Sequence, residues 1–340
     1  MNISSIVGEP GKKVSGRILV AYTTSRIPVE LPVTIVQGIN PGPTLVVTAG
    51  VHGRELVGIM GLGKVLRDLD PTKMSGNLVA APAVNMSAVE FGDRVTLWDK
   101  GDLNRQKSGK KEGTVTQRLA YHLYHDVVLR ADAYIDLHSS NAEGYVWYTI
   151  CLVEEEGARP DVIAKSKEMA LAFGLEQIFG KTPWKGTFKG EAIRQGIPSM
   201  STEVGGGTDF FQNGRKQIEA TARGIMNVMK LMRIIEGPIE TESNKSIWWN
   251  GHTEVLNDGV GGLMLMEAQR GQFLKKGDVF ATKYDATTGE EVAKIYAPAD
   301  GTVLNTGLVW PLCPPERFVG VMGDKMEEVD LTSHRWAYWS

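Results

Sequence analysis

Strand-like apolar runs alternate with helix-like segments through the first 240 residues, and this alternation constrains the fold most strongly. The runs cover residues 44–50, 77–85, 133–139 and 197–204, and the helical periods cover residues 56–69, 115–129, 162–173 and 217–235. Apolar strands separated by helices are typical of a parallel sheet that is covered on both faces. Residues 13–34 indicate two further strands joined by a polar turn. We therefore predict, for residues 1–240, an α/β domain with a mixed, largely parallel sheet and an N-terminal β-hairpin.

The pattern changes after residue 237. Residues 237–246 (GPIETESNKS) are polar and have no helical period, which predicts a linker. Short strands then alternate with turns such as Lys276-Gly277-Asp278 and Asp300-Gly301. We predict a smaller all-β domain over residues 247–340.

Charge and hydropathy exclude several classes of partner. The net charge of −3 provides no basic field for nucleic acid, and lysine and arginine form no long run. No stretch reaches the roughly 18 apolar residues of a membrane span, and the N-terminus shows no apolar signal segment. We expect a cytoplasmic protein that binds neither nucleic acid nor membrane.

Polar residues interrupt the joint between the first apolar strand and the first helix. The sequence there is VHGRE, with His52 and Glu55 three residues apart. In open α/β sheets, ligands bind at the carboxyl ends of the strands, and imidazole with carboxylate is a common pair of zinc ligands. The alternative is a loop histidine followed by a carboxylate at the helix N-terminus. The motif alone does not decide between them.

Two more strands end in residues of the same kind. Residues 133–139 (AYIDLHS) end near His138, and alternation places Asp136 on the same face as a partner for its imidazole. Residues 197–204 contain Glu203, followed by three glycines. A carboxylate in a buried strand is costly unless it is paired or protonated, so Glu203 is either a general base beside a metal site or half of an ion pair with an arginine.

The polar stretch after residue 85 contributes Arg94, Asn104 and Arg105. Guanidinium groups bind carboxylates with two parallel hydrogen bonds, and an adjacent amide adds a further donor. Alone, the stretch has the composition of a solvated loop. Together with three polar strand ends, it predicts a substrate-binding segment.

These elements, in this order, resemble a known family. HGRE (residues 52–55), the series Asn85, Arg94 and DLNR (102–105), DLH (136–138) and TEVG (202–205) are similar to motifs of the aspartoacylase and succinylglutamate desuccinylase family. That family belongs to the zinc carboxypeptidase superfamily, and the resemblance extends to a C-terminal barrel-sandwich domain. It implies a zinc carboxypeptidase-like fold with this smaller domain behind it.

The resemblance also implies roles for individual residues. One Zn²⁺ per chain would be held by His52, Glu55 and His138, and zinc-bound water would attack the substrate amide. Glu203 would be the general base and then the proton donor. Arg94 would polarise the carbonyl, Asn104 and Arg105 would bind the substrate carboxylate, and Arg194 is a further candidate for that binding. Tyr284 and Tyr296 are alternative counterparts of the family's C-terminal tyrosine, and neither is assigned to the site. Arg54 stands where relatives carry Asp or Thr.

The expected activity is deacylation of a small N-acyl amino acid or related N-acyl metabolite by a zinc-dependent amidohydrolase. A homo-oligomer is compatible with the sequence, which does not define the oligomeric state. A metallocarboxypeptidase acting on short peptides remains an alternative, because the superfamily uses the same residues on C-terminal peptide bonds. A non-catalytic metabolite-binding homologue is the third alternative. Retention of all three metal-ligand candidates and of Glu203 argues against it, because a protein that has lost its activity commonly loses at least one such residue.

Overall fold

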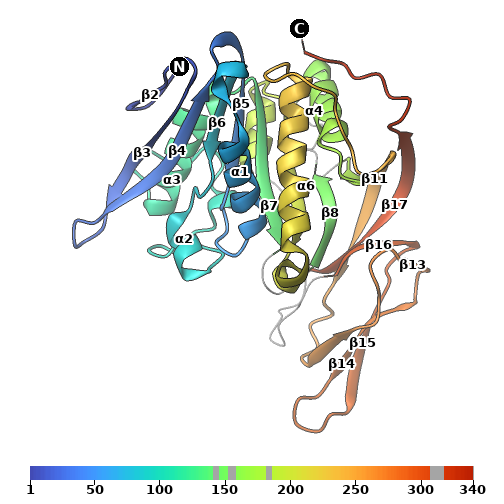
Figure 1. Ribbon diagram of the computed structural model, residues 1–340. Coiled ribbons are helices and arrows are strands. Elements are labelled where there is room, and N and C mark those ends of the chain that lie inside the picture. The colour runs from blue at the N-terminus through green and yellow to red at the C-terminus, as the bar shows by residue number, and fades with distance from the viewer. Residues whose placement is uncertain (141–144, 152–157, 181–185, 307–317, 340) are drawn as a thin grey trace.

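The computed structural model describes residues 1–140, 145–151, 158–180, 186–306 and 318–339 (Figure 1). A sheet of twelve strands forms its centre, in the order β13-β16-β17-β11-β9-β8-β10-β7-β5-β6-β4-β3. In chain order these strands are β3 (Lys12–Tyr22), β4 (Pro28–Gln37), β5 (Asn40–Ala49), β6 (Ser75–Ala81), β7 (Ala133–Ser140), β8 (Tyr145–Cys151), β9 (Gln177–Phe179), β10 (Ser199–Gly206), β11 (Lys245–Leu256), β13 (Phe273–Leu274), β16 (Gly301–Thr306) and β17 (Phe318–Asp330). The short strands β1 (Asn2–Ile3) and β2 (Ile6–Val7) pair with each other.

The middle of the sheet is parallel, as predicted. Strands β6, β5, β7 and β10 are neighbours, and each adjacent pair runs in the same direction. The predicted hairpin is β3 with β4, which joins the parallel core antiparallel to β6. The α/β class is confirmed. The sequence did not indicate β8, which runs antiparallel to β10, or the three-residue β9.

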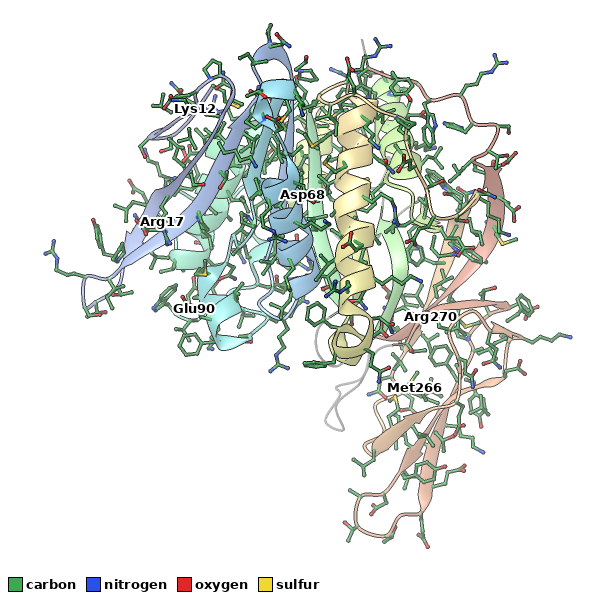
Figure 2. The ribbon with its side chains drawn as sticks, viewed as in Figure 1. Lys12, Arg17, Asp68, Glu90, Met266 and Arg270 are labelled. Carbon is green, nitrogen blue, oxygen red and sulfur yellow. The ribbon has the colours of Figure 1, made fainter. Side chains whose placement is uncertain are left out.

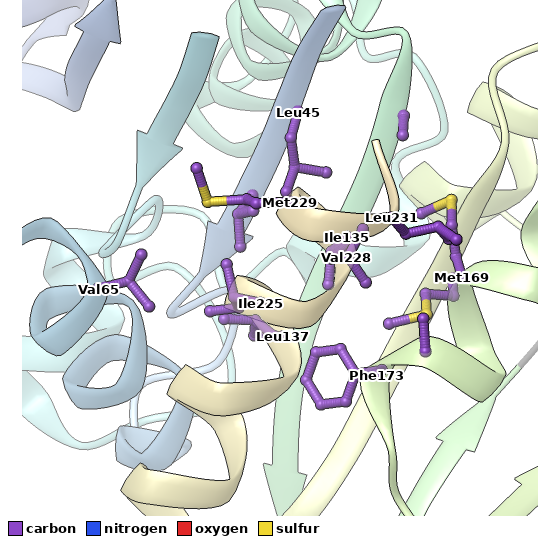
Figure 3. Close-up of a cluster of buried hydrophobic side chains, with 14 of the residues drawn as sticks. Leu45, Val65, Ile135, Leu137, Met169, Phe173, Ile225, Val228, Met229 and Leu231 are labelled. Atoms are coloured by element: carbon purple, nitrogen blue, oxygen red, sulfur yellow. The ribbon is translucent and has the colours of Figure 1, made fainter. Parts of the chain in front are cut away.

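Helices cover both faces of this core. They are α1 (Leu56–Asp68), α2 (Met86–Phe91), α3 (Val115–His122), α4 (Pro160–Phe173), α5 (Phe188–Arg194) and α6 (Phe210–Leu231). Figure 3 shows α6 and α4 packing Ile225 and Phe173 toward Leu137 of β7. Side chains from α3 and α5 pack with Tyr134 of β7 in a second core, on the other face. Consecutive residues of β7 therefore face different cores, which explains why strand 133–139 is apolar on both sides.

Helix α6 begins seven residues before the predicted start, at Phe210. The polar residues of its first turns hide the apolar period from which the start was predicted. The polar stretch after residue 85 contains α2, whose N-cap is Asn85: its side-chain oxygen accepts from the backbone N–H of Ala88. Asn85 therefore has a structural role.

The C-terminal region is only partly separate from the large sheet. Strand β11 pairs in parallel with β9, and β17 pairs with β11, so the sheet continues past the predicted linker. A separate sheet is formed by β12 (Leu263–Met266), β14 (Val279–Tyr284) and β15 (Glu291–Tyr296), with its own apolar core around Phe280. Figure 2 shows Met266 and Arg270 in this region, at the opposite end of the molecule from Arg17 of β3. The boundary at residue 247 stays a prediction.

The C-terminal region also contacts β8 directly. Asn305 of β16 pairs with Val146, and Val146 pairs with Gly205 at the end of β10. The region therefore joins the large sheet at the carboxyl end of β10. Within the described ranges, no helix is both long enough and apolar enough to cross a membrane.

Candidate metal centre

The carboxyl ends of β5, β7 and β10 meet at one edge of the sheet, because the three strands are adjacent and parallel. His52 and Glu55 lie in the turn that follows β5, and His138 lies near the end of β7. Glu203 of β10 is the direct cross-strand neighbour of His138. The structure therefore brings these four predicted residues to the same edge.

His52, Glu55 and His138 form a compact buried cluster. The Glu55 carboxylate bridges the two imidazoles, with Oε1 at 2.6 Å from Nδ1 of His52 and Oε2 at 2.8 Å from Nδ1 of His138. Each residue can offer one ligand atom, all within 4.8 Å of one another, and each residue is less than 5 % exposed. Among the described residues, this group could hold a metal ion.

Carboxylates bind the opposite nitrogen of both imidazole rings. Nε2 of His52 lies 3.2 Å from Oδ1 of Asp102, and Nε2 of His138 lies 3.2 Å from Oδ2 of Asp136. A hydrogen bond from Nε2–H to a carboxylate fixes the ring and leaves the Nδ1 lone pair for a metal. Both Nδ1 atoms point at Glu55, so the arrangement matches a three-ligand site in which a fourth position remains for water or substrate.

The charges of the cluster depend on one another. Burial alone would raise the pKa of Glu55, but the two imidazoles hold that pKa well below its usual range. Burial would lower the pKa of His52 and of His138, but the carboxylates that contact each ring raise both pKa values. Asp136 stays ionised for the same reason, since His138 and Thr48 lower its pKa against the effect of burial. A dication would replace protons on these rings.

Glu203 differs from these carboxylates. It is half-buried, and its backbone position beside His138 directs it to the face that carries Asp136. Burial, reinforced by the charge of Glu55, raises the pKa of Glu203 to about 7 despite the opposing effect of His138. A carboxyl group with this pKa can accept and return a proton near neutral pH.

Close backbone contact shapes the turn between β5 and α1. A side chain at Gly53 would place its Cβ 1.7 Å from the carbonyl oxygen of Ala88, so only glycine fits. The N–H of Gly53 donates to the carbonyl of Asp93, at 2.7 Å. The exposed Arg54 donates from Nε to the carbonyl of Gly92, which ties this turn to the end of α2. Arg54 therefore has a structural contact outside the metal-ligand cluster.

Asp102 is a site residue whose role the sequence did not reveal. Its Oδ2 accepts from Nε and Nη2 of Arg94 at 3.1 and 2.9 Å, while its Oδ1 contacts His52. Burial would raise the pKa of Asp102, but His52 and Arg94 hold it well below the usual range. Arg94 is thereby connected to the cluster through Asp102. The DLNR motif contains the signal, but only the fold shows which histidine Asp102 contacts.

Asn104 lies against the cluster, and Arg105 lies beside it. Nδ2 of Asn104 is 3.4 Å from Nε2 of His138, and the buried Oδ1 of Asn104 has no hydrogen-bond partner among the described residues. A buried polar atom without a partner is costly, so this oxygen is available to a bound group. Arg105 is exposed, and its Nη1 donates to the carbonyl of Asn104 at 2.8 Å.

The structure does not bring Arg194 or the two tyrosines to the cluster. Arg194 ends α5, before β10 begins, and forms an ion pair with Glu191 at 2.6 Å. Tyr284 adjoins the turn between β14 and β15, and Tyr296 is more than half exposed. Within the described ranges, neither tyrosine has a hydrogen bond or ring contact with the cluster.

Helix α5 instead contributes a residue that the sequence did not single out. Lys189 is 2 % exposed, and its Nζ donates to Oγ of Ser201 at 2.8 Å. Ser201 is the cross-strand neighbour of Asp136, on the face that also carries Glu203. The charge of Lys189 lowers the pKa values of both carboxyl groups. Lys189 is therefore a buried cation behind the cluster.

Comparison with known proteins identifies the family of this chain. The model of the succinylglutamate desuccinylase/aspartoacylase catalytic domain matches residues 41–232, more than half of the chain. The chain belongs to this family. All four strand-end residues, His52, Glu55, His138 and Glu203, fall inside the matched range of the family domain.

Individual proteins are similar to this chain over most of their length. The N-alpha-acetyl-L-2,4-diaminobutyric acid deacetylase of Halomonas elongata is 27% identical over 282 residues, which cover 81% of this chain and 80% of that protein. A succinylglutamate desuccinylase/aspartoacylase structure from Rhodobacter sphaeroides has a TM-score of 0.81 at 25% identity, covering 93% of this chain and 95% of that one. The product-bound ectoine utilization protein EutE (DoeB) of Ruegeria pomeroyi also has a TM-score of 0.81, at 21% identity with 92% and 95% covered, and shares the fold.

Proposed function

We propose that the protein is a zinc-dependent amidohydrolase that removes the acyl group from a small N-acyl amino acid, releasing a carboxylate and a free amine. One observation carries the proposal: the buried His52–Glu55–His138 cluster lies directly beside Glu203 at the carboxyl edge of the parallel strands. Zinc suits the donor set, because two imidazole nitrogens and one carboxylate leave an open fourth position.

The chain's own residues have distinct tasks in this reaction. Zinc, when bound, supplies a Lewis acid that activates water and polarises the substrate carbonyl. Glu203 takes a proton and returns it to the leaving nitrogen, because its pKa of about 7 permits both directions near neutral pH. Asp102 and Asp136 hold the two histidine rings in orientation from behind.

Arginine and amide donors complete the proposed site. Arg94 uses Nε and Nη2 for Asp102, which leaves Nη1 for an oxygen of the substrate carbonyl. Arg105 and the Nδ2 donor of Asn104 bind the substrate carboxylate in this proposal, with Arg105 supplying the charge. The Halomonas relative is named for deacetylation of an acetylated amino acid, which favours an N-acyl amino acid over a peptide as substrate.

A substrate panel tests the proposal. Chelator-treated protein, with and without added zinc, is incubated with N-acetyl and N-succinyl amino acids and with dipeptides, and free amine is measured. We expect zinc-dependent release from one or more N-acyl amino acids. Release from dipeptides alone would instead establish a carboxypeptidase. Zinc binding without hydrolysis of any compound would favour a non-catalytic metabolite-binding protein.

A further inference from the structure

The strand that carries Glu203 is irregular immediately after this residue. The pairing of β10 with β7 shifts between Glu203 and Gly206, and its pairing with β8 shifts between Glu203 and Gly205. After Val204 come three glycines, Gly205 to Gly207, with φ values of +54°, +86° and +57°. A Cβ at Gly206 would come within 2.4 Å of the carbonyl oxygen of Ser140. The bulge therefore requires glycine, which adds backbone freedom next to a residue that must be held in place.

One buried amide fixes this bulge from the opposite face of the sheet. Gln217 of α6 is fully buried, and its Oε1 accepts from the N–H of Gly206 at 3.2 Å. Its Nε2 donates to Oδ2 of Asp209 at 2.6 Å. A Cβ at Gly205 would lie 2.3 Å from this Nε2, so the amide packs directly on the glycine backbone. Gln217 thus connects the end of β10 to the start of α6.

We propose that Gln217 is a positioning residue that sets the direction of the Glu203 carboxylate through the glycine bulge. Bulges beside active sites re-aim the side chains next to them, and a displacement of about 1 Å at a reacting group can lower a rate about 100-fold. Gln217 is buried on the face of the sheet that α6 covers, whereas the Glu203 side chain lies on the face that α5 covers. The Gln217 amide therefore acts on Glu203 through the backbone of the glycine bulge. The inference rests on the proposed function of Glu203.

A pair of matched variants tests the inference. Gln217→Leu removes both hydrogen bonds and is expected to lower kcat about 10- to 100-fold, with KM and zinc affinity nearly unchanged. Asn227→Leu is the control, because Asn227 is also fully buried on α6 and its amide binds both the N–H and the carbonyl of Glu240. We expect a similar loss of Tm in both variants and a loss of kcat in the first alone. An equal loss of kcat in both, or none in Gln217→Leu, would overturn the inference.

A partner exchange gives a second, independent result. Gln217→Glu places two carboxylates opposite each other and should lower kcat, whereas Gln217→Glu with Asp209→Asn restores a donor–acceptor pair. If the hydrogen bond between the side chains at positions 217 and 209 positions Glu203, the double variant should recover kcat to within about threefold of wild type. Failure of the double variant to recover, when its Tm does recover, would contradict a positioning role.

A readout without hydrolysis separates this inference from the proposed function. In protein labelled with ¹³C at glutamate carboxyl carbons, the Glu203 signal is assigned by its loss in Glu203→Gln. We expect Gln217→Leu to move this signal and its titration midpoint, and Asn227→Leu to leave both unchanged. If wild-type protein hydrolyses no N-acyl amino acid but this difference is found, the proposed function fails and the inference holds. If the signal is the same in all three proteins, the inference fails.

Discussion

The region that carries the His52–Glu55–His138 cluster and the C-terminal region each bury one lysine among the described residues, and the two lysines have different partners. Lys283 of β14 donates to Oδ1 of Asn257 and to the carbonyl of Val260, at 2.5 and 2.8 Å, and pairs with Asp258. These acceptors belong to one short loop, so the charge holds that loop on its own sheet. Lys189 instead lies behind a cluster of ionisable groups, near Asp136 and Glu203.

The difference shows how two regions of one chain tolerate buried charge. Burying a charge costs several kcal/mol unless it is paired or hydrogen-bonded. In the C-terminal region, hydrogen bonds and an ion pair from one short loop offset the cost of burying Lys283, and they hold that loop in place. The strand-end cluster concentrates several carboxylates and two imidazoles in one place, so its members shift each other's pKa values. We therefore expect substitutions in the cluster to change chemistry and those at Lys283 to change stability.

The largest expected effect is that of Glu203→Gln. Removal of the proton acceptor should lower kcat by about 10²- to 10⁴-fold at pH 7 and above, while zinc is still bound. This is measured as free amine released per zinc-loaded protein. A variant with zinc content and kcat both equal to wild type would remove Glu203 from the mechanism.

The same substitution should stabilise the metal-free protein at high pH. The folded-state pKa of about 7 lies above the ordinary value of 4.5, so the folded protein binds this proton more tightly than the unfolded chain. The resulting stability is present below pH 4.5 and is lost as the pH rises through 7. Glu203→Gln, which stays neutral, should therefore raise Tm relative to wild type at pH 8 and change it little at pH 4. A lower Tm at pH 8 would contradict the assigned pKa direction.

Asp102→Asn should have the next largest effect. Loss of the carboxylate behind a metal-ligating imidazole typically weakens metal affinity about 10- to 100-fold. Competition with a chromophoric chelator measures this change. Asp93→Asn is the control, because Asp93 lies in the same loop but pairs with Lys100. Equal zinc affinities of the two variants would show that Asp102 does not support His52.

The sequence predicted the strand-end residues of the site because each strand could be recognised alone. His52 follows one apolar run, His138 and Glu203 lie near the ends of two others, and parallel strands bring their carboxyl ends together. Asp102 and Lys189 were missed as partners, because their contacts with His52 and Ser201 are set by the packing of separate elements. Such contacts leave no periodic signal in the sequence.

The limits of the fold prediction have a similar cause. The continuation of the large sheet into β11 and β17 depends on the pairing of β11 with β9, a strand of only three residues. A strand of that length gives no hydrophobic period. The polar residues 237–246 therefore predict a linker between two domains, and the sequence does not indicate that the large sheet continues beyond them. The parallel core was predictable, because its strands are long and separated by helices.

The two buried lysines provide the fourth prediction. Lys189→Met removes a charge that lowers the pKa of Glu203, so the acidic limb of the pH–kcat profile should move to higher pH. Lys283→Met should lower stability by about 1–3 kcal/mol, since Asn257 and Val260 lose a donor, and should leave the pH profile unchanged. The pH–kcat profile and the Tm of each variant test these two expectations. A shifted pH–kcat profile in Lys283→Met would mean that the charge of Lys283 influences the ionisation of the cluster.

Arg194→Ala should have the smallest effect. Arg194 and Glu191 form a partly exposed pair on one helix, which contributes about 0.2–0.5 kcal/mol, and among the described residues Arg194 makes no contact with the cluster. We expect KM to change less than about twofold, whereas Arg105→Ala, which removes a cation beside Asn104, should raise KM about tenfold or more. If Arg194→Ala raised KM as much as Arg105→Ala does, the end of α5 would have to approach the substrate, and the prediction from the sequence would be correct. The comparison of the two arginines therefore tests whether the binding site is confined to the carboxyl edge of the sheet.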